Sequence, residues 1–187
     1  MPYADIYLGL LVGGHGTRLG GIDKARLRDG NASFVERLVS ALGPAVAEVV
    51  LSGRGDQAYP EVDCRLLPDR RAGKGPLAGL ETLLGDAPAP WCFLVACDMP
   101  RIDAAVLDRL AMCRVESSSI VVATTPFGWE PTCALYHVDL LPRVSKLLDA
   151  NRRALHTLLH DVGCTEAQLP EALAARLLNV NEPGDHP

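Results

Sequence analysis

The chain has 187 residues, of which 48% are hydrophobic, 5% aromatic and 22% charged, and its formal net charge is −5. This length and composition predict one domain, spanning residues 1–187, with a sizeable core, and exclude a disordered chain. The negative charge argues against a general nucleic-acid or acidic-membrane surface.

Short apolar runs alternate with helical patterns along the chain, which is typical of βαβ units around a mainly parallel sheet. The first helix carries clear local signals, because Ser33 and Glu36 form a capping box and Gly43 ends the pattern. In chain order we expect a strand at 6–12, the helix after Ser33, strands at 48–52 and 65–67, a helix at 76–84, a strand at 91–97 and a helix at 103–112. Strands at 120–123 and 133–136, helices at 139–149 and 153–161, and a last strand at 176–180 complete the pattern. We therefore expect an α/β protein, a three-layer Rossmann-like sandwich with a mainly parallel sheet.

The six cysteines form no C-x-x-C pair, and Cys92 and Cys97 lie in an apolar run, which argues against a zinc site or a disulfide framework. The first residues, MPYADIYL, carry no basic region ahead of a hydrophobic segment. The apolar runs fall far short of the roughly 20 residues needed to cross a bilayer. We expect a cytoplasmic protein.

A glycine-rich loop follows the first strand in the segment LLVGGHGTRLGGIDK, residues 10–24, with Arg18 and Lys24 spaced among its glycines. Glycines allow backbone N–H groups to approach an anion closely and to form anion-holding concavities. A P-loop would end in Gly-Lys-Ser/Thr, and Leu19 breaks the dinucleotide pattern G-x-G-x-x-G. The remaining pattern indicates a loop that presents a nucleoside triphosphate, with a flexible connection as the alternative.

Two aspartates follow predicted strands and are expected to meet this loop, because ligands of open α/β sheets bind outside the carboxyl ends of the strands. Asp98 follows the strand at 91–97, and Asp69 follows the strand at 65–67. One such carboxylate suffices for Mg²⁺, which leaves its other positions to water and phosphate. The alternatives are a cap on the next turn for Asp98 and an ordinary Pro-Asp turn for Asp69. Lys74 is interpreted as a solvated loop residue.

No nucleophile–base pair stands out in the sequence, which also lacks the G-x-S-x-G elbow of α/β-hydrolases and an H-E-x-x-H motif. His15 lies in the glycine loop, as a ligand contact or as a tolerated loop residue. An attacking phosphate is largely ionised at neutral pH, since its second pKa is about 6. Such a reaction needs no strong protein base, and positioning with charge neutralisation can carry the catalysis.

Motifs along most of the chain resemble those of the molybdenum cofactor guanylyltransferases (MobA), in the nucleotidyltransferase superfamily. They are LVGGHGTRLGGIDK at 11–24, Asp69, GPLAGL at 75–80, ACDMP at 96–100, EPTCALY at 130–136 and LLNVNEP at 177–183. The resemblance implies a fold of the nucleotide-diphospho-sugar transferase type and Mg²⁺ as cofactor. It also implies transfer of GMP from GTP to the terminal phosphate of molybdopterin, giving molybdopterin guanine dinucleotide and pyrophosphate. The implied partners are these two substrates, with transient contact to molybdopterin-donating proteins and acceptor molybdoenzymes, and neither nucleic acid nor membrane.

The resemblance also implies residue roles at matching positions. The nucleotide would be lined by Leu11, Val12, Gly13 and Gly14, its phosphates held by Lys24 with Arg18, its guanosine contacted by Ser52 and Asp69, Mg²⁺ bound by Asp98, and the pterin faced by Asn179 and Asn181. Arg18, Lys24 and Asp98 are the expected catalytic residues. The chain departs from the family at Val12, Ser52 and Glu130, where alanine, asparagine and histidine are common. The valine would narrow the pocket near the base, and the glutamate would change how the pterin phosphate or its neighbours are met.

Three alternatives remain on the sequence alone. The first is a cytidylyltransferase that makes the cytosine form of the same cofactor, since the same loop serves both reactions. The second is a transferase acting on a sugar phosphate or another small phosphate acceptor. The third is a non-catalytic nucleotide-binding regulatory protein, against which the presence of both Lys24 and Asp98 argues.

Overall fold

The computed structural model describes residues 2–13 and 24–180. The strands of the main sheet are β1 (Ile6–Leu11), β4 (Val49–Gly53), β5 (Arg65–Pro68), β6 (Trp91–Ala96), β7 (Ile120–Thr125), β8 (Gly128–His137) and β9 (Thr165–Gln168). They form one seven-stranded sheet in the order β5-β4-β1-β6-β8-β7-β9. Strands β5, β4, β1 and β6 run parallel, and β8 runs antiparallel to both β6 and β7. The carboxyl ends of β1, β4, β5, β6 and β7 therefore lie at one edge of the sheet.

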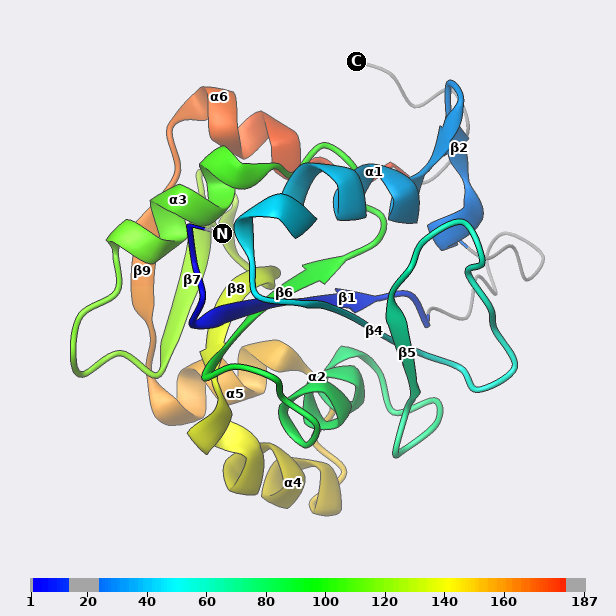
Figure 1. Ribbon diagram of the computed structural model, residues 1–187. Coiled ribbons are helices and arrows are strands. Elements are labelled where there is room, and N and C mark those ends of the chain that lie inside the picture. Colours follow the sequence, from blue (N-terminus) through cyan, green and yellow to red (C-terminus); the bar gives the residue numbers. More distant parts are fainter. Residues whose placement is uncertain (1, 14–23, 181–187) are drawn as a thin grey trace.

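Helices cover both faces of this sheet, as Figure 1 shows. One layer contains α1 (Phe34–Leu42), α3 (Ala104–Met112) and α6 (Glu171–Ala174), and the other contains α2 (Pro76–Leu84), α4 (Leu141–Asp149) and α5 (Leu155–Val162). Alternation along β1 feeds both cores, since Leu8 packs in the cluster under α1 and α3 while Tyr7 packs in the cluster under α2 and α4. The predicted three-layer α/β sandwich is confirmed.

The first helix begins as its capping signals predict. The Ser33 hydroxyl accepts from the Glu36 backbone N–H at 3.3 Å, and the Glu36 carboxylate accepts from the Ser33 N–H at 2.6 Å. Hydrogen bonding with Ser33 holds the pKa of Glu36 below its usual value, and the bond from the Ser33 backbone N–H contributes most. Asp103 caps α3 in a similar way, by accepting from the Ala105 N–H at 3.1 Å.

The structure corrects four details of the predicted elements. The strand expected at 133–136 is the carboxyl half of the longer β8, and β9 and the small hairpin of β2 (Arg28–Asp29) and β3 (Ala32–Ser33) had no predicted counterpart. The strand expected at 176–180 is wrong, because Ala175–Leu177 form a 3-10 turn and the next residues pair with no strand of the described chain. Other 3-10 turns lie at Lys24–Arg26, Gly43–Ala45 and Val138–Leu140. Within the described ranges, the helices are too short or too polar to cross a bilayer.

Candidate active site

A cavity of about 540 Å³ opens at the carboxyl edge of the sheet, next to the first turn of α2. Strands β1 and β6 point toward this same side of the molecule (Figure 1). Most of the predicted site residues that the structure describes line it: Leu11, Gly13, Lys24, Ser52, Asp69 and Asp98. The fold thus brings together segments that are far apart in the sequence.

Lys24 and Asp98 form an ion pair in the wall of this cavity. Asp98 lies just beyond the end of β6, and its Oδ2 accepts from Lys24 Nζ at 3.1 Å, with about a quarter of each side chain exposed (25% and 24%). The single carboxylate of Asp98 matches the ligands from which Mg²⁺ is bound, one or two carboxylates completed by water and phosphate, whereas the Lys24 ammonium can pair only with anions. The residues present therefore fit this ion when a polyphosphate shares the site.

Ser52, near the end of β4, and Asp69, just after β5, form a second polar pair. The buried Ser52 hydroxyl donates to Asp69 Oδ1 at 2.6 Å, and the Asp69 backbone N–H donates to the Gly53 carbonyl at 2.8 Å. Burial raises the pKa of the Asp69 carboxyl above its usual value, and the hydrogen bond from Ser52 partly opposes that rise. Because a carboxylate only accepts hydrogen bonds, this end of the cavity is suited to N–H donors.

Val12 lies behind the cavity wall. Its side chain is 1% exposed and packs in the core under α1, and its carbonyl accepts from the Tyr59 hydroxyl and from Gln57 Nε2, each at 3.4 Å. A Cβ at Gly13 would lie 2.8 Å from the Gly53 Cα, so the chain after β1 passes close against the chain after β4. A valine in place of alanine therefore acts on core packing and not on the width of the cavity.

The first turn of α2 closes the cavity on the side of the second helix layer. Gly75 precedes the helix with a φ of +78°, a conformation that favours glycine, and Pro76 occupies the first turn. Both residues and Gly79 line the cavity, where a Cβ on Gly79 would lie 2.4 Å from Leu11 Cδ2. The positive dipole end of α2 thus favours negative charge in the cavity.

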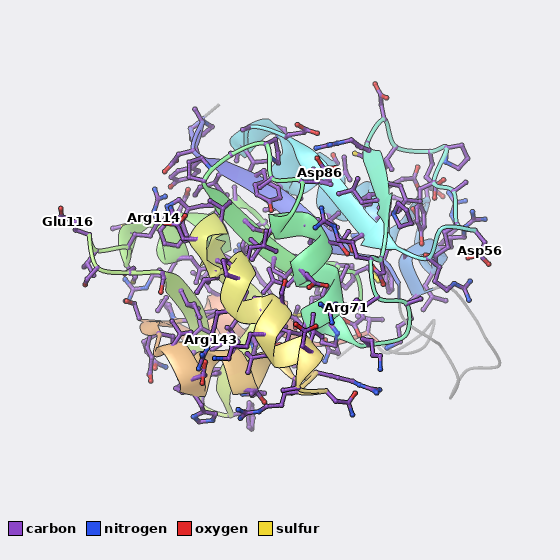
Figure 2. The ribbon with its side chains drawn as sticks, turned by 90° about the horizontal axis from the view of Figure 1, so that it is seen from below. Asp56, Arg71, Asp86, Arg114, Glu116 and Arg143 are labelled. Carbon is purple, nitrogen blue, oxygen red and sulfur yellow. The ribbon has the colours of Figure 1, made fainter. Side chains whose placement is uncertain are left out.

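A buried carboxylate holds the loop that leads from Asp69 to α2. Glu81, 4% exposed, accepts from Arg71 Nε at 2.9 Å and from the Ser145 hydroxyl at 2.7 Å, and Arg71 also donates to Asp149 at 2.7 Å. Figure 2 shows Arg71 beside α2 and α4. Sequence reasoning missed this network, although a glutamate within the apolar run LAGLETLL was a signal.

The remaining predicted site residues lie outside the described ranges or away from the cavity lining. Gly14, Arg18 and Asn181 fall outside the described residues, as does His15. Asn179 is exposed, and the Val180 N–H after it donates to the Asp98 carbonyl at 2.8 Å, which brings this segment to Asp98. Lys74 does not line the cavity, whereas Thr132 of β8, which was not predicted as a site residue, does.

Comparisons with known proteins agree with this geometry. Residues 9–165 match the family described as the MobA-like NTP transferase domain. The probable molybdenum cofactor guanylyltransferase of Chloroflexus aggregans is 30% identical over 195 residues (99% of this chain and 94% of that protein), and that of Deinococcus radiodurans is 33% identical over 178 residues (94% and 89%). The crystal structure of molybdopterin-guanine dinucleotide biosynthesis protein A from Archaeoglobus fulgidus shares the fold, with a TM-score of 0.77, 19% identity and coverage of 96% of this chain and 94% of that one.

Proposed function

The chain belongs to the MobA-like NTP transferase family, and we propose that it transfers GMP from GTP to the terminal phosphate of molybdopterin, forming molybdopterin guanine dinucleotide and pyrophosphate. Relatives at 30% and 33% identity over most of the chain bear the guanylyltransferase name. The observation that carries the proposal is one cavity with an acceptor pair, Ser52–Asp69, toward one end and the Lys24–Asp98 ion pair farther along it.

The sheet order sets the scale of this cavity. Asp69 follows β5 and Asp98 follows β6, and β4 and β1 lie between these strands. Because the Asp69 carboxylate reaches Ser52 on β4, two to three strand spacings separate it from Asp98, which amounts to roughly 10–14 Å. That length accommodates a base at the Asp69 end and the phosphates at the Asp98 end of one nucleotide.

Asp69 is the group that we assign to the base. A carboxylate can accept from both N1–H and the exocyclic amine of guanine, whereas cytosine offers only an exocyclic amine and adenine carries no N1–H. Leaving a buried hydrogen-bonding group unpaired costs about 1–3 kcal/mol. The Ser52 hydroxyl orients this carboxylate. Leu11 and Gly13, at the end of β1, line the cavity and are assigned to contact the nucleotide, as is Gly14, the next residue in the sequence.

Lys24 and Asp98 are assigned to the phosphates. An oxygen of the molybdopterin phosphate attacks the α-phosphorus of GTP, and the bond from that phosphorus to the pyrophosphate oxygen breaks. Lys24, assisted by Arg18 and the first turn of α2, offsets the negative charge that gathers there, and the attacking phosphate needs no protein base. Asp98 would hold Mg²⁺, which when bound supplies further charge neutralisation at the phosphate oxygens. Asn179 and Asn181 are assigned to the pterin side.

The test is pyrophosphate release from each of the four common ribonucleoside triphosphates in the presence of Mg²⁺ and molybdopterin. We expect kcat/KM for GTP to exceed that for CTP and ATP by at least about tenfold, since a site built on hydrogen bonds rejects analogues that leave them unpaired. Reactions without molybdopterin serve as the control. Equal use of CTP would replace the guanylyl assignment by the cytidylyl one.

A further inference from the structure

A bulge in β8 turns Thr132 toward the cavity. Strand β7 pairs Val122 with Ala134 and the next residue, Ala123, with Glu130, so the intervening residues of β8 have no partner on β7 in the described ladder. The hydroxyl of the fully buried Tyr136 donates to the Pro131 carbonyl at 2.8 Å and fixes this bulge. Bulges beside sites commonly re-aim a side chain, and Thr132 is the residue of β8 that lines the cavity.

Both hydrogen-bond donors of Thr132, its hydroxyl and its backbone N–H, are bonded to the Glu130 carboxylate. Its Oε1 accepts from the Thr132 hydroxyl at 2.5 Å and from the Thr132 backbone N–H at 3.3 Å. A threonine hydroxyl has one proton and two lone pairs. With that proton directed to Glu130, the hydroxyl oxygen offers the cavity only an acceptor.

Thr132 lies at the opposite end of the cavity from Asp69, the residue assigned to the nucleotide base. The strand order puts the Asp69 carboxylate near β4 and β5 and Thr132 on β8, with Asp98 between them. Three to four strand spacings amount to roughly 14–19 Å. Phosphate oxygens need hydrogen-bond donors, such as the ammonium group of Lys24. An acceptor backed by the Glu130 carboxylate therefore suits neither the triphosphate nor the leaving pyrophosphate.

We propose that Thr132, positioned by Glu130, accepts a hydrogen bond from an N–H or O–H of the acceptor substrate close to its phosphate, and so selects that substrate. The inference rests on the proposed function, in which the acceptor is molybdopterin and the matching donor is an N–H of its reduced pterin. Thr132 is then a specificity residue that touches substrate, and Glu130 is a positioning residue.

The experiment measures KM for molybdopterin and KM for GTP separately in matched variants. Thr132→Val keeps the side-chain shape but removes the oxygen, so the KM for molybdopterin should rise about tenfold, as one lost hydrogen bond implies, while the KM for GTP stays unchanged. Thr132→Ser keeps the oxygen and should restore the original KM. Thr157→Val makes the same change on α5, away from the cavity lining, and should alter neither constant.

A second pair of variants keeps the inference testable if Thr132→Val fails to fold. Glu130→Ala frees the Thr132 proton and should raise the KM for molybdopterin alone, whereas Glu130→Gln retains an oxygen that accepts from Thr132 and should restore it. An unchanged KM for molybdopterin in Thr132→Val, or in Glu130→Ala where only that variant folds, overturns the inference and leaves the proposed function standing. If the unchanged protein releases no pyrophosphate, the proposed function fails, and the inference about Thr132 fails with it.

Discussion

Asp98 and Lys24 are paired at 3.1 Å and both are partly exposed in the cavity, so a charged ligand can reach either group. Replacement of Asp98 by asparagine keeps the side-chain shape but removes the negative charge that we assign to binding Mg²⁺. Loss of a major electrostatic stabiliser lowers turnover by about 10²–10³-fold, and we expect that loss in kcat for Asp98→Asn.

The measurement is pyrophosphate release at limiting and at saturating Mg²⁺. The exposed Asp63→Asn, which makes the same chemical change on the loop before β5, serves as the control and should retain activity. Near-normal turnover of Asp98→Asn at limiting Mg²⁺ would remove Asp98 from the metal assignment.

Asp69 links the chemistry of the site to stability. Because burial raises its pKa in the folded chain, the folded state binds more protons than the unfolded state at pH values between the ordinary pKa of 3.8 and the raised one. The free energy of unfolding therefore falls as the pH rises through that window, and the loss persists at neutral pH. Asp69→Asn keeps an oxygen that accepts from Ser52 and removes this loss.

We therefore expect Asp69→Asn to be more stable than the unchanged chain at pH 7 and to lose that advantage as the pH falls toward 3.8. Urea unfolding across this range measures the difference, and the preference for GTP over CTP should weaken in the same variant. Lower stability of Asp69→Asn at pH 7 would show that ionised Asp69 is not a cost to folding.

At the scale of elements, the sequence predicted those helix starts that depend only on residues next to one another in the chain. The Ser33–Glu36 capping box and the proline at the start of α2 both mark real helix starts. Strand β9 lacks such a signal, because the edge sequence TEAQ buries only Ala167 and shows little apolar alternation. The first half of β8 was missed because Pro131 indicates a break, and only a bulge admits a proline there.

The loop between Asp69 and α2 depends on the Glu81–Arg71–Asp149 network. Arg71→Ala would leave the buried Glu81 carboxylate with Ser145 as its remaining partner, at a cost of about 3 kcal/mol in the free energy of unfolding. Asp149→Ala removes a partner that is 67% exposed and should cost less than about 1 kcal/mol.

Urea unfolding at neutral pH compares these two variants. The KM for GTP should also rise in Arg71→Ala, because that loop carries Asp69, and should hold in Asp149→Ala. Equal stability losses in the two variants would mean that burial of Glu81 does not govern the network.

At the scale of the whole molecule, the cavity gathers residues from the ends of four parallel strands and from one antiparallel strand. The sequence predicts the convergence of Lys24, Asp69 and Asp98, because parallel strands end at one edge and each residue follows a strand or its loop. It does not predict Thr132, since that residue enters from within the antiparallel β8 and depends on the bulge. The burial of Glu81 likewise follows from packing between α2 and α4, which no local pattern encodes.

The most direct measurement gives the protein equal concentrations of GTP and CTP with Mg²⁺ and limiting molybdopterin, and quantifies the two dinucleotide products by mass spectrometry. Competition in one vessel reports the ratio of the two kcat/KM values without separate assays. Acceptor oxygens at Asp69 predict molybdopterin guanine dinucleotide in at least about tenfold excess over the cytosine form. Equal amounts of the two products, or an excess of the cytosine form, would contradict guanylyl transfer.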